Sequence, residues 1–379
     1  MTVVCKRAIL PEGFLASGIH SGIKRKGKLD LALFYSQMPA KASCKFTTNS
    51  IVAAPIVVSK KYLKANKLFQ ALIANSGNAN CFTGQAGLKD AQDSTKIVAC
   101  VLGIKKESIL VSSTGIIARK MPMAEIKRAV PGLVKILSKR GIDQAKEAIL
   151  TTDTFAKEVT ARFKIGNKTI TICGVAKGAG MIAPNMATML AFVFSDANIT
   201  QKALDKALGI SLDSSFNCIT VDGCMSTNDS LIMMANGACG NALIDVNKNF
   251  KPFIDALKIV CLELAKMVVK DAEGISKFIQ IKVSRAKSFK EARTVALSIA
   301  NSNLFKTAVY GENPNFGRIA AAAGASGIGV LEKDLKIKVS SLKKKEIYVD
   351  VSVGRGDSSA IVYTSDLTPE YIKINADYN

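Results

Sequence analysis

The sequence contains a single histidine, His20, and no tryptophan. One histidine leaves almost no material for a Ser-His-Asp triad, the arrangement that commonly activates a hydroxyl nucleophile. Nine cysteines are present, but no pair has the Cys-x-x-Cys spacing of a zinc or redox site, and zinc would also require histidine. We therefore expect reduced, mostly buried cysteines and no metal, and we assign no role to His20.

Long apolar runs are absent as well. The longest one, Met186 to Phe194, is too short to cross a bilayer, and the first residues lack the features of a signal peptide. A cytoplasmic protein with no membrane partner is the default expectation. Hydrophobic residues still make up 48% of the 379 residues, which is enough for a large core in one to three domains.

Acidic residues are scarce relative to basic ones, with 30 Asp and Glu against 52 Lys and Arg and a net charge of +22. Such an excess is typical of nucleic-acid-binding proteins. The lysines are scattered, however, and no aromatic residues alternate with them as a stacking platform. We expect no nucleic-acid partner, and we attribute the charge to general lysine richness and to attraction for small anionic substrates.

Short strand-like and helix-like segments alternate along the whole chain, which predicts an α/β fold built from α+β layers. We divide it into an N-terminal α/β domain (1–198), a small α+β domain (199–276) and a C-terminal α+β domain (277–379). Helices are expected at 88–102, 124–138, 201–213, 253–270 and 316–323, and the helix at 201–213 has Thr200 as its N-cap. Strands are expected at 29–35, 51–59, 71–74, 108–112, 159–165, 169–175, 188–194, 218–221, 230–235, 278–283, 335–339, 347–353 and 360–363.

The segment from Lys177 to Phe192 is the most informative stretch of the sequence. Its residues 178–183 match Gly-x-Gly-x-x-Ala, which is the dinucleotide-binding pattern when a helix follows at once. Pro184 and Asn185 interrupt any such helix, so the glycines more simply allow tight turns that bring Lys177 and Thr188 together.

Thr188 is a candidate nucleophile. A threonine hydroxyl is a weak nucleophile unless a base stands beside it, and histidine is not available here. A threonine at a chain N-terminus can use its own α-amine as that base. This mechanism would require the chain to be cut between Ala187 and Thr188.

Three other polar groups have a functional and a simpler interpretation. The hydroxyl and glycine of Ser113-Thr114-Gly115, after a strand, could donate to an oxyanion, although alone they indicate a turn. The cluster Thr151-Thr152-Asp153-Thr154 is typical of a turn or N-cap. Glu273 ends a long helix, where an acidic residue opposes the helix dipole, so it is either functional or simply solvated.

Together these segments resemble the ornithine acetyltransferase family of arginine biosynthesis, also called glutamate N-acetyltransferases. The matching motifs occur in order along essentially the whole chain. They include Asn75-Ser76-Gly77-Asn78-Ala79-Asn80, Ser113-Thr114-Gly115, Thr151-Thr152-Asp153-Thr154, Lys177-Gly178-x-Gly180-Met181, Ala187-Thr188-Met189-Leu190, Ser226-Thr227-Asn228-Asp229, Pro314-Asn315-x-Gly317-Arg318 and Ile374-Asn375-Ala376.

The resemblance implies a DmpA/ArgJ-like sandwich of β-sheets flanked by helices. It also implies self-cleavage at Ala187–Thr188 into an α chain (1–187) and a β chain, which associate as two α and two β chains. Thr188 would be the nucleophile, and Thr114 and Gly115 the oxyanion hole. The implied substrate contacts are Thr151 or Thr152, Lys177, Thr188, Glu273 and Asn375.

The implied reaction is a ping-pong transfer of acetyl from N-acetylornithine to glutamate through acetyl-Thr188, without metal or organic cofactor. Acetyl-CoA as a second acetyl donor is left open. One alternative is a related self-processing amidase or aminopeptidase, in which water replaces the acceptor amine. A non-enzymatic alternative keeps the scaffold without the cut, as a basic binding protein.

Three positions depart from the family pattern. Phe316 stands where the family usually has tryptophan, and Cys224-Met225 replaces more polar residues. The sequence ends at Asn379, about one residue before a hydroxyl residue that the family uses to bind substrate. We expect this end to weaken the C-terminal contact or to change the substrate range.

Overall fold

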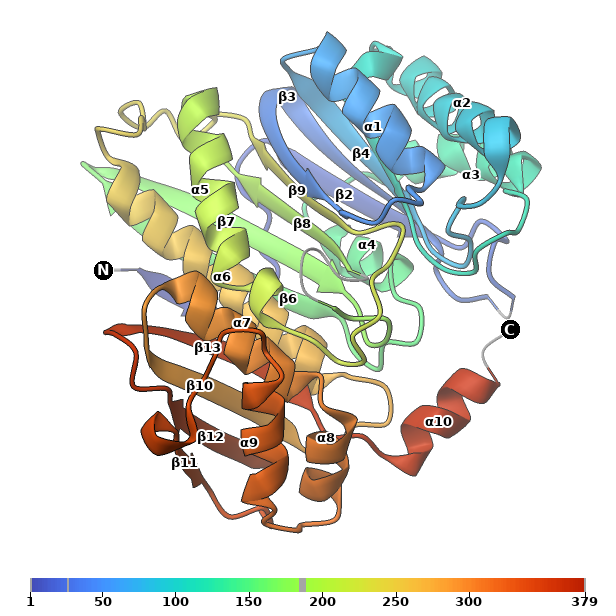
Figure 1. Ribbon diagram of the computed structural model, residues 1–379. Coiled ribbons are helices and arrows are strands. Elements are labelled where there is room, and N and C mark those ends of the chain that lie inside the picture. The colour runs from blue at the N-terminus through green and yellow to red at the C-terminus, as the bar shows by residue number, and fades with distance from the viewer. Residues whose placement is uncertain (1, 26, 184–188, 378–379) are drawn as a thin grey trace. The chain divides into compact units, whose positions relative to one another are not determined.

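The computed structural model describes residues 2–25, 27–183 and 189–377 of the chain (Figure 1). Packing divides the chain into two compact units. Unit 1 comprises Met1–Gly178, Thr188–Ser214 and Ser226–Leu264, and unit 2 comprises Ala179–Ala187, Ser215–Met225 and Ala265–Asn379. Both units are therefore assembled from separate stretches of sequence. The division at 198 and 276 stays a prediction.

Within the described residues, unit 1 contains a sheet of nine strands. Its order is β1-β6-β7-β8-β9-β3-β4-β5, and β2 also pairs with β3. The strands are β1 (Val3–Cys5), β2 (Phe14–Ile19), β3 (Leu31–Phe46), β4 (Phe69–Asn75), β5 (Ile109–Ser113), β6 (Lys157–Ile165), β7 (Lys168–Lys177), β8 (Leu190–Ser195) and β9 (Ser230–Ala235).

The long strand β3 connects the two halves of this sheet. Its first part pairs with β2 and β4, its register shifts between Tyr35 and Ala40, and its second part pairs with β9. Phe34 of β3 stacks on Phe194 of β8 with 5.0 Å between ring centroids, and it meets Phe192 edge-on at 5.4 Å. These rings lie in the main hydrophobic core, so the same core supports both halves.

Strand β8 lies between β7 and β9. It pairs antiparallel with β7, with Leu190 opposite Lys177, and parallel with β9. Strand β9 in turn pairs with β3. Strands β8 and β9, which follow residue 188 in sequence, therefore lie together in one sheet between two strands that precede residue 187, β7 on one side and β3 on the other.

The helices of unit 1 cover this sheet (Figure 1), and α1 and α2 contact β5. They are α1 (Ala54–Ala65), α2 (Gly84–Leu102), α3 (Met123–Lys135), α4 (Ile142–Ala148) and α5 (Gln201–Asp213). The prediction for α5 is confirmed to its N-cap, since the Thr200 hydroxyl accepts from the Ala203 N–H. The strand predicted at 51–59 is wrong. Pro55 occupies the first turn of a helix there, and Ile56, Ser59 and Tyr62 share its buried face.

Unit 2 contains a four-stranded sheet of order β11-β12-β10-β13, with helices packed against it. Its elements are β10 (Phe278–Ala286), α7 (Phe289–Ala300), α8 (Asn303–Tyr310), α9 (Phe316–Gly324), β11 (Lys336–Val339), β12 (Glu346–Ser352), β13 (Ser358–Ser365) and α10 (Pro369–Ala376). The strand predicted at 218–221 is wrong, because a 3₁₀ turn spans Phe216–Cys218 and only Ile219 pairs, with Tyr363. The remaining long helix is α6 (Phe250–Lys270).

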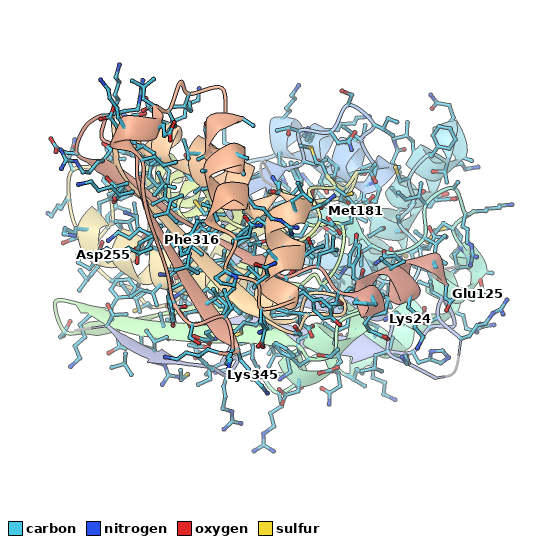
Figure 2. All side chains as sticks on the ribbon, turned by 60° about the horizontal axis from the view of Figure 1, so that its bottom comes forward. Lys24, Glu125, Met181, Asp255, Phe316 and Lys345 are labelled. Atoms are coloured by element: carbon cyan, nitrogen blue, oxygen red, sulfur yellow. The ribbon has the colours of Figure 1, made fainter. Side chains whose placement is uncertain are left out.

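This mixture of sheets flanked by helices confirms the predicted α/β class. Across the described ranges, no helix is both long enough and apolar enough to cross a membrane. Phe316, at the family's usual tryptophan position, is about half exposed at the start of α9 (Figure 2). A larger ring is therefore not required there to fill a core.

Candidate active site

The ends of the parallel strands β4 and β5 build the first part of the site. Asn75 and Ser113 are paired in register, and the Ser113 hydroxyl donates to Asn75 Oδ1 at 2.6 Å. The Thr114 N–H then donates to the Asn75 carbonyl at 2.9 Å. Thr114 is consequently buried and held at the carboxyl edge of the sheet, where ligands commonly bind in α/β folds.

Gly115 is required by the geometry of this turn. Its φ is +128°, and a Cβ at this position would overlap the backbone of Gly77 and Asn78. Among the hydrogen bonds of the described residues, none uses the Gly115 N–H. The turn thus holds the Thr114 hydroxyl and the Gly115 N–H in a fixed backbone, as an oxyanion hole needs.

Lys177, the last residue of β7, brings an ammonium group to this turn. It is buried, with 2% of its surface exposed, and its Nζ donates to Thr114 Oγ1 at 3.5 Å. Asp153 Oδ2 lies 4.0 Å from the same Nζ. Two predicted site residues that are 63 positions apart in sequence therefore meet in the interior of unit 1.

Asp153 is the centre of a buried charged cluster. Its Oδ1 accepts from Lys157 Nζ at 2.5 Å and from the Gly178 N–H at 2.6 Å, and its Oδ2 accepts from the Thr151 N–H at 2.9 Å. Burial by itself would raise the pKa of Asp153. The charges of Lys177 and Lys157 outweigh that effect and hold the pKa well below its usual value. Asp153 is therefore ionised at neutral pH, where it fixes Thr151 and the start of the Gly178 loop.

Lys24 (labelled in Figure 2) adds a further positive charge. Its Nζ donates to the carbonyls of Leu150, at 2.5 Å, and Leu29, at 3.1 Å. Burial lowers the pKa of Lys24 to about 8, against the opposing attraction of Asp30. Leu150 directly precedes the predicted contacts Thr151 and Thr152 in sequence. Lysine charge thus gathers around these threonines, which suits an anionic group on a substrate.

Asp229 is a buried carboxyl next to the start of β8. Its Oδ1 accepts from the Met189 N–H at 2.9 Å, and its Oδ2 has no hydrogen-bond partner among the residues that the structure describes. The nearby Thr47 hydroxyl donates instead to the Ser226 carbonyl at 2.7 Å. Burial raises the pKa of Asp229 well above its usual value, although the Met189 N–H, the charge of Lys177 and the hydroxyls of Thr47 and Ser226 act in the other direction. Burial thus favours the protonated form of this carboxyl.

Unit 2 holds the two remaining predicted contacts, and it places them side by side. Asn375 Nδ2 of α10 donates to Glu273 Oε2 at 2.8 Å. The Glu273 N–H donates to the Ala179 carbonyl at 3.1 Å, and a Cβ on Gly180 would overlap the Glu273 carboxylate. The second glycine of Gly178-Ala179-Gly180 thus leaves room for this carboxylate. The expectation that these glycines bring Lys177 and Thr188 together stays a prediction, because Thr188 lies outside the described residues.

Ala187 and Thr188, the predicted cleavage site and nucleophile, lie outside the described residues. Their roles stay predictions, as do the roles of the oxyanion and substrate-binding residues. Within the part of the chain that is described, no group of three His, Cys, Asp or Glu side chains is arranged to hold a metal ion.

Residues 15–379 match the sequence model of the ArgJ family. The chain belongs to the ArgJ family. This membership confirms the resemblance drawn from the motifs, and with it the prediction of an acyltransferase of arginine biosynthesis.

Relatives of the ArgJ family align along nearly the whole chain. The "Arginine biosynthesis bifunctional protein ArgJ" of Caldanaerobacter subterraneus subsp. tengcongensis is 43% identical, over 100% of both chains. The mitochondrial ArgJ protein of Candida albicans is 40% identical over 99% of this chain and 95% of its own. A crystal structure of ornithine acetyltransferase with ornithine from Mycobacterium tuberculosis is similar at 33% identity. It covers 50% of this chain and 100% of that chain, with a TM-score of 0.46.

Sequence reasoning assigns no role to the two acidic residues of this candidate site. It places Asp153 in a cluster typical of a turn or N-cap, and it names Asp229 only within a family motif. One signal was available for each, because both carboxylates belong to the family motifs around Thr151 and Ser226. Lys24 also stands in a family motif, Gly22-Ile23-Lys24, whereas Lys157 carries no such signal, since it is one lysine among many in a basic chain.

The raised pKa of Asp229 leads to a testable prediction. Asp229→Asn keeps an acceptor for the Met189 N–H without charge, so we expect a free energy of unfolding within about 1 kcal/mol of wild type at pH 5. Asp229→Ala removes that acceptor, and we expect a loss of about 1–3 kcal/mol in urea denaturation.

The pH dependence provides a second check on Asp229. A carboxyl whose pKa is raised by folding binds its proton more tightly in the native state, so wild-type stability should fall as the pH rises above about 4. The fall continues up to the folded pKa and should be missing in Asp229→Asn. Equal pH slopes for the two proteins would show that Asp229 is ionised in the fold.

Proposed function

We propose that the chain is a self-processing acetyltransferase that moves acetyl from N-acetyl-L-ornithine to L-glutamate through an acetyl-Thr188 intermediate. The observation that carries this proposal is the buried contact of Lys177 with Thr114, beside the turn at Gly115. Family membership supports the substrate class, since the relatives are named for arginine biosynthesis.

In the proposed maturation step, the Thr188 hydroxyl attacks the Ala187 carbonyl and forms an ester by an N→O acyl shift. Water then hydrolyses the ester, which gives the α chain a new carboxylate and leaves Thr188 with a free α-amine. Lys177 and Leu190 are paired across β7 and β8, so the sheet holds both ends of the segment that contains this bond. Such restraint favours the intramolecular attack over competing reactions.

In the proposed transfer cycle, the Thr188 α-amine accepts the proton of its own hydroxyl, and the oxygen attacks the acetyl carbonyl. The Thr114 hydroxyl and the Gly115 N–H donate to the developing oxyanion. Ornithine leaves with the proton, and the amine of glutamate then attacks the acetyl ester. The ammonium of Lys177 suits a substrate carboxylate, and Glu273 suits a substrate amine.

The proposed cycle uses no metal or organic cofactor. The relatives are named bifunctional proteins, and we propose acetyl-CoA as a second acetyl donor to glutamate on this ground. We also propose an assembly of two α and two β chains. The amidase alternative differs from this cycle only in its acceptor, which is water in place of the glutamate amine. The cytoplasmic location stays a prediction.

The test combines intact-mass measurement of the purified wild-type protein under denaturing conditions with an acetyl-transfer assay. We expect two chains, of residues 1–187 and 188–379, and glutamate-dependent release of ornithine from N-acetylornithine. The same assay with acetyl-CoA tests the second donor. Release of acetate without need for glutamate would support the amidase instead. An uncut chain would favour the non-enzymatic alternative, a basic binding protein.

The sheet order gives a prediction about the cleaved protein. Because β8 pairs with β7 and β9 pairs with β3, the α and β chains share one hydrogen-bonded sheet. We expect them to co-elute in native size-exclusion chromatography after complete cleavage and to separate only in denaturant. Two separate native peaks would contradict this pairing.

A further inference from the structure

Asp222 collects four hydrogen bonds within unit 2. Its carboxylate accepts from the N–H groups of Met181 at 2.7 Å, Ile182 at 2.9 Å and Cys224 at 3.0 Å, and from the Tyr371 hydroxyl at 3.1 Å. One side chain therefore contacts both the segment that follows Gly180 and the helix α10. None of the predicted roles in the site uses Asp222 or Tyr371.

The segment at Met181 depends on this carboxylate. Met181 (Figure 2) has a φ of +56°, a left-handed conformation that is uncommon for residues other than glycine. Its side chain is 40% exposed, so core packing does not impose this conformation. The conformation of Met181 is held instead by the two consecutive N–H groups that donate to Asp222. The hydrogen bond from the Val221 N–H to the Ile182 carbonyl, at 2.8 Å, adds to this restraint.

Helix α10 also depends on polar bonds for its position. It has no buried residue, so the hydrophobic effect contributes little to holding it. Its N-cap Thr368 donates to the Gly274 carbonyl at 2.6 Å, and the hydroxyl of Tyr371 reaches Asp222. Burial and the nearby charge of Asp222 raise the pKa of Tyr371, so this hydroxyl stays a donor at any physiological pH.

The same helix carries Asn375 one turn after Tyr371. Asn375 Nδ2 donates to the Tyr371 carbonyl at 3.0 Å and to Glu273 Oε2 at 2.8 Å. A Cβ on Gly274 would overlap the Tyr371 N–H group, so the backbone beside Glu273 is in close contact with α10. A shift of α10 would therefore move Asn375 away from Glu273.

We infer that Asp222 and Tyr371 are positioning residues that fix Asn375 and Glu273 against the segment 179–182. The inference rests on the proposed function for its last step, in which Glu273 and Asn375 contact the substrate. Asp222 determines the backbone that supports Glu273, and through Tyr371 it determines where α10 presents Asn375.

The test uses Tyr371→Phe, which removes one hydroxyl and keeps the ring. A hydrogen bond to a charged group is lost, so we expect the KM for N-acetylornithine to rise about tenfold with kcat changed less than about twofold. Hydrogen exchange of the amides in α10 should become about tenfold faster, and the extent of chain cleavage should stay the same.

Tyr348→Phe is the matched control. The Tyr348 hydroxyl also donates to a carboxylate, Glu346 Oε2 at 3.0 Å, but Tyr348 lies on β12 and not on α10. We expect this variant to match wild type in KM and in exchange of α10. The inference is overturned if Tyr371→Phe leaves both quantities unchanged, or if both variants change them equally. If the wild type transfers no acetyl, the exchange result still tests the anchoring of α10, and the proposed function alone fails.

Discussion

Replacing Thr188 by alanine is expected to give a single uncut chain of 379 residues that transfers no acetyl. Alanine has no hydroxyl to attack the Ala187 carbonyl, so no ester forms and no α-amine is released. The same change removes the oxygen that would carry the acetyl group. We expect the loss of cleavage and the loss of acetyl transfer to be complete, because the proposed mechanism has no second nucleophile. Intact mass under denaturing conditions and the transfer assay measure them separately.

The variant Thr188→Ser is the control for this prediction. Serine keeps a hydroxyl and, once released, an α-amine, so we expect cleavage and transfer to persist at reduced rates. Alanine differs from threonine by a few atoms, and strand β8 pairs with both neighbours from Leu190 onward. Loss of fold is therefore not the expected cause of inactivity, and circular dichroism checks this. Cleavage of Thr188→Ala at the same bond would show that another residue is the nucleophile.

Much of the fold could be predicted from the sequence wherever local pattern and packing agree. Strand β9 has the predicted bounds, and α5 begins after the predicted cap. The errors occur where local sequence pattern and tertiary packing disagree. Residues 51–59 are rich in β-branched side chains, but Pro55 begins a helix and tertiary packing favours its buried face. The segment 218–221 is apolar but makes only one bridge, so its burial does not come from a ladder.

The candidate site was predictable in its hydroxyls and glycines and not in its electrostatics. Thr114, Gly115 and Lys177 stand in recognisable motifs, and the structure brings them together. A sequence with 52 basic residues does not show which of them are buried. In the described part of the chain, Lys157 and Lys306 are almost fully buried. Lys157 binds Asp153 only four residues earlier, whereas Lys306 binds the Val221 carbonyl 85 positions away, a tertiary contact that no local spacing encodes.

This arrangement indicates which lysines of the basic chain would attract an anionic substrate. Lys157 and Lys177 face the buried carboxylate of Asp153, and Lys24 lies near it beside a second buried carboxylate, Asp30, so the three lysines outnumber these two acids. An anionic substrate group would neutralise that excess at close range, where screening by salt is weak. The scattered surface lysines are not needed for this effect.

Replacing Asp153 by asparagine should therefore be among the most destabilising changes in unit 1. The variant removes the carboxylate that pairs with both Lys157 and Lys177 in the interior, and breaking a buried ion pair in this way costs about 3–5 kcal/mol. We expect the free energy of unfolding in urea to fall by that amount near pH 7. Cleavage and transfer should also fall, because Asp153 anchors the Gly178 N–H beside Lys177.

The control for Asp153→Asn is Asp143→Asn. Asp143 pairs with Lys146 at 3.0 Å but is 61% exposed, and an exposed ion pair contributes about 0–1 kcal/mol. The pH dependence adds a further check. Because folding lowers the pKa of Asp153, its contribution is present above about pH 4 and is lost as the pH falls through the folded pKa. The stability gap between wild type and Asp153→Asn should thus be constant near neutrality and should narrow below about pH 4. A gap that stays below about 1 kcal/mol at pH 7, like that of Asp143→Asn, would mean that water or backbone groups solvate the two lysines as well as the carboxylate does.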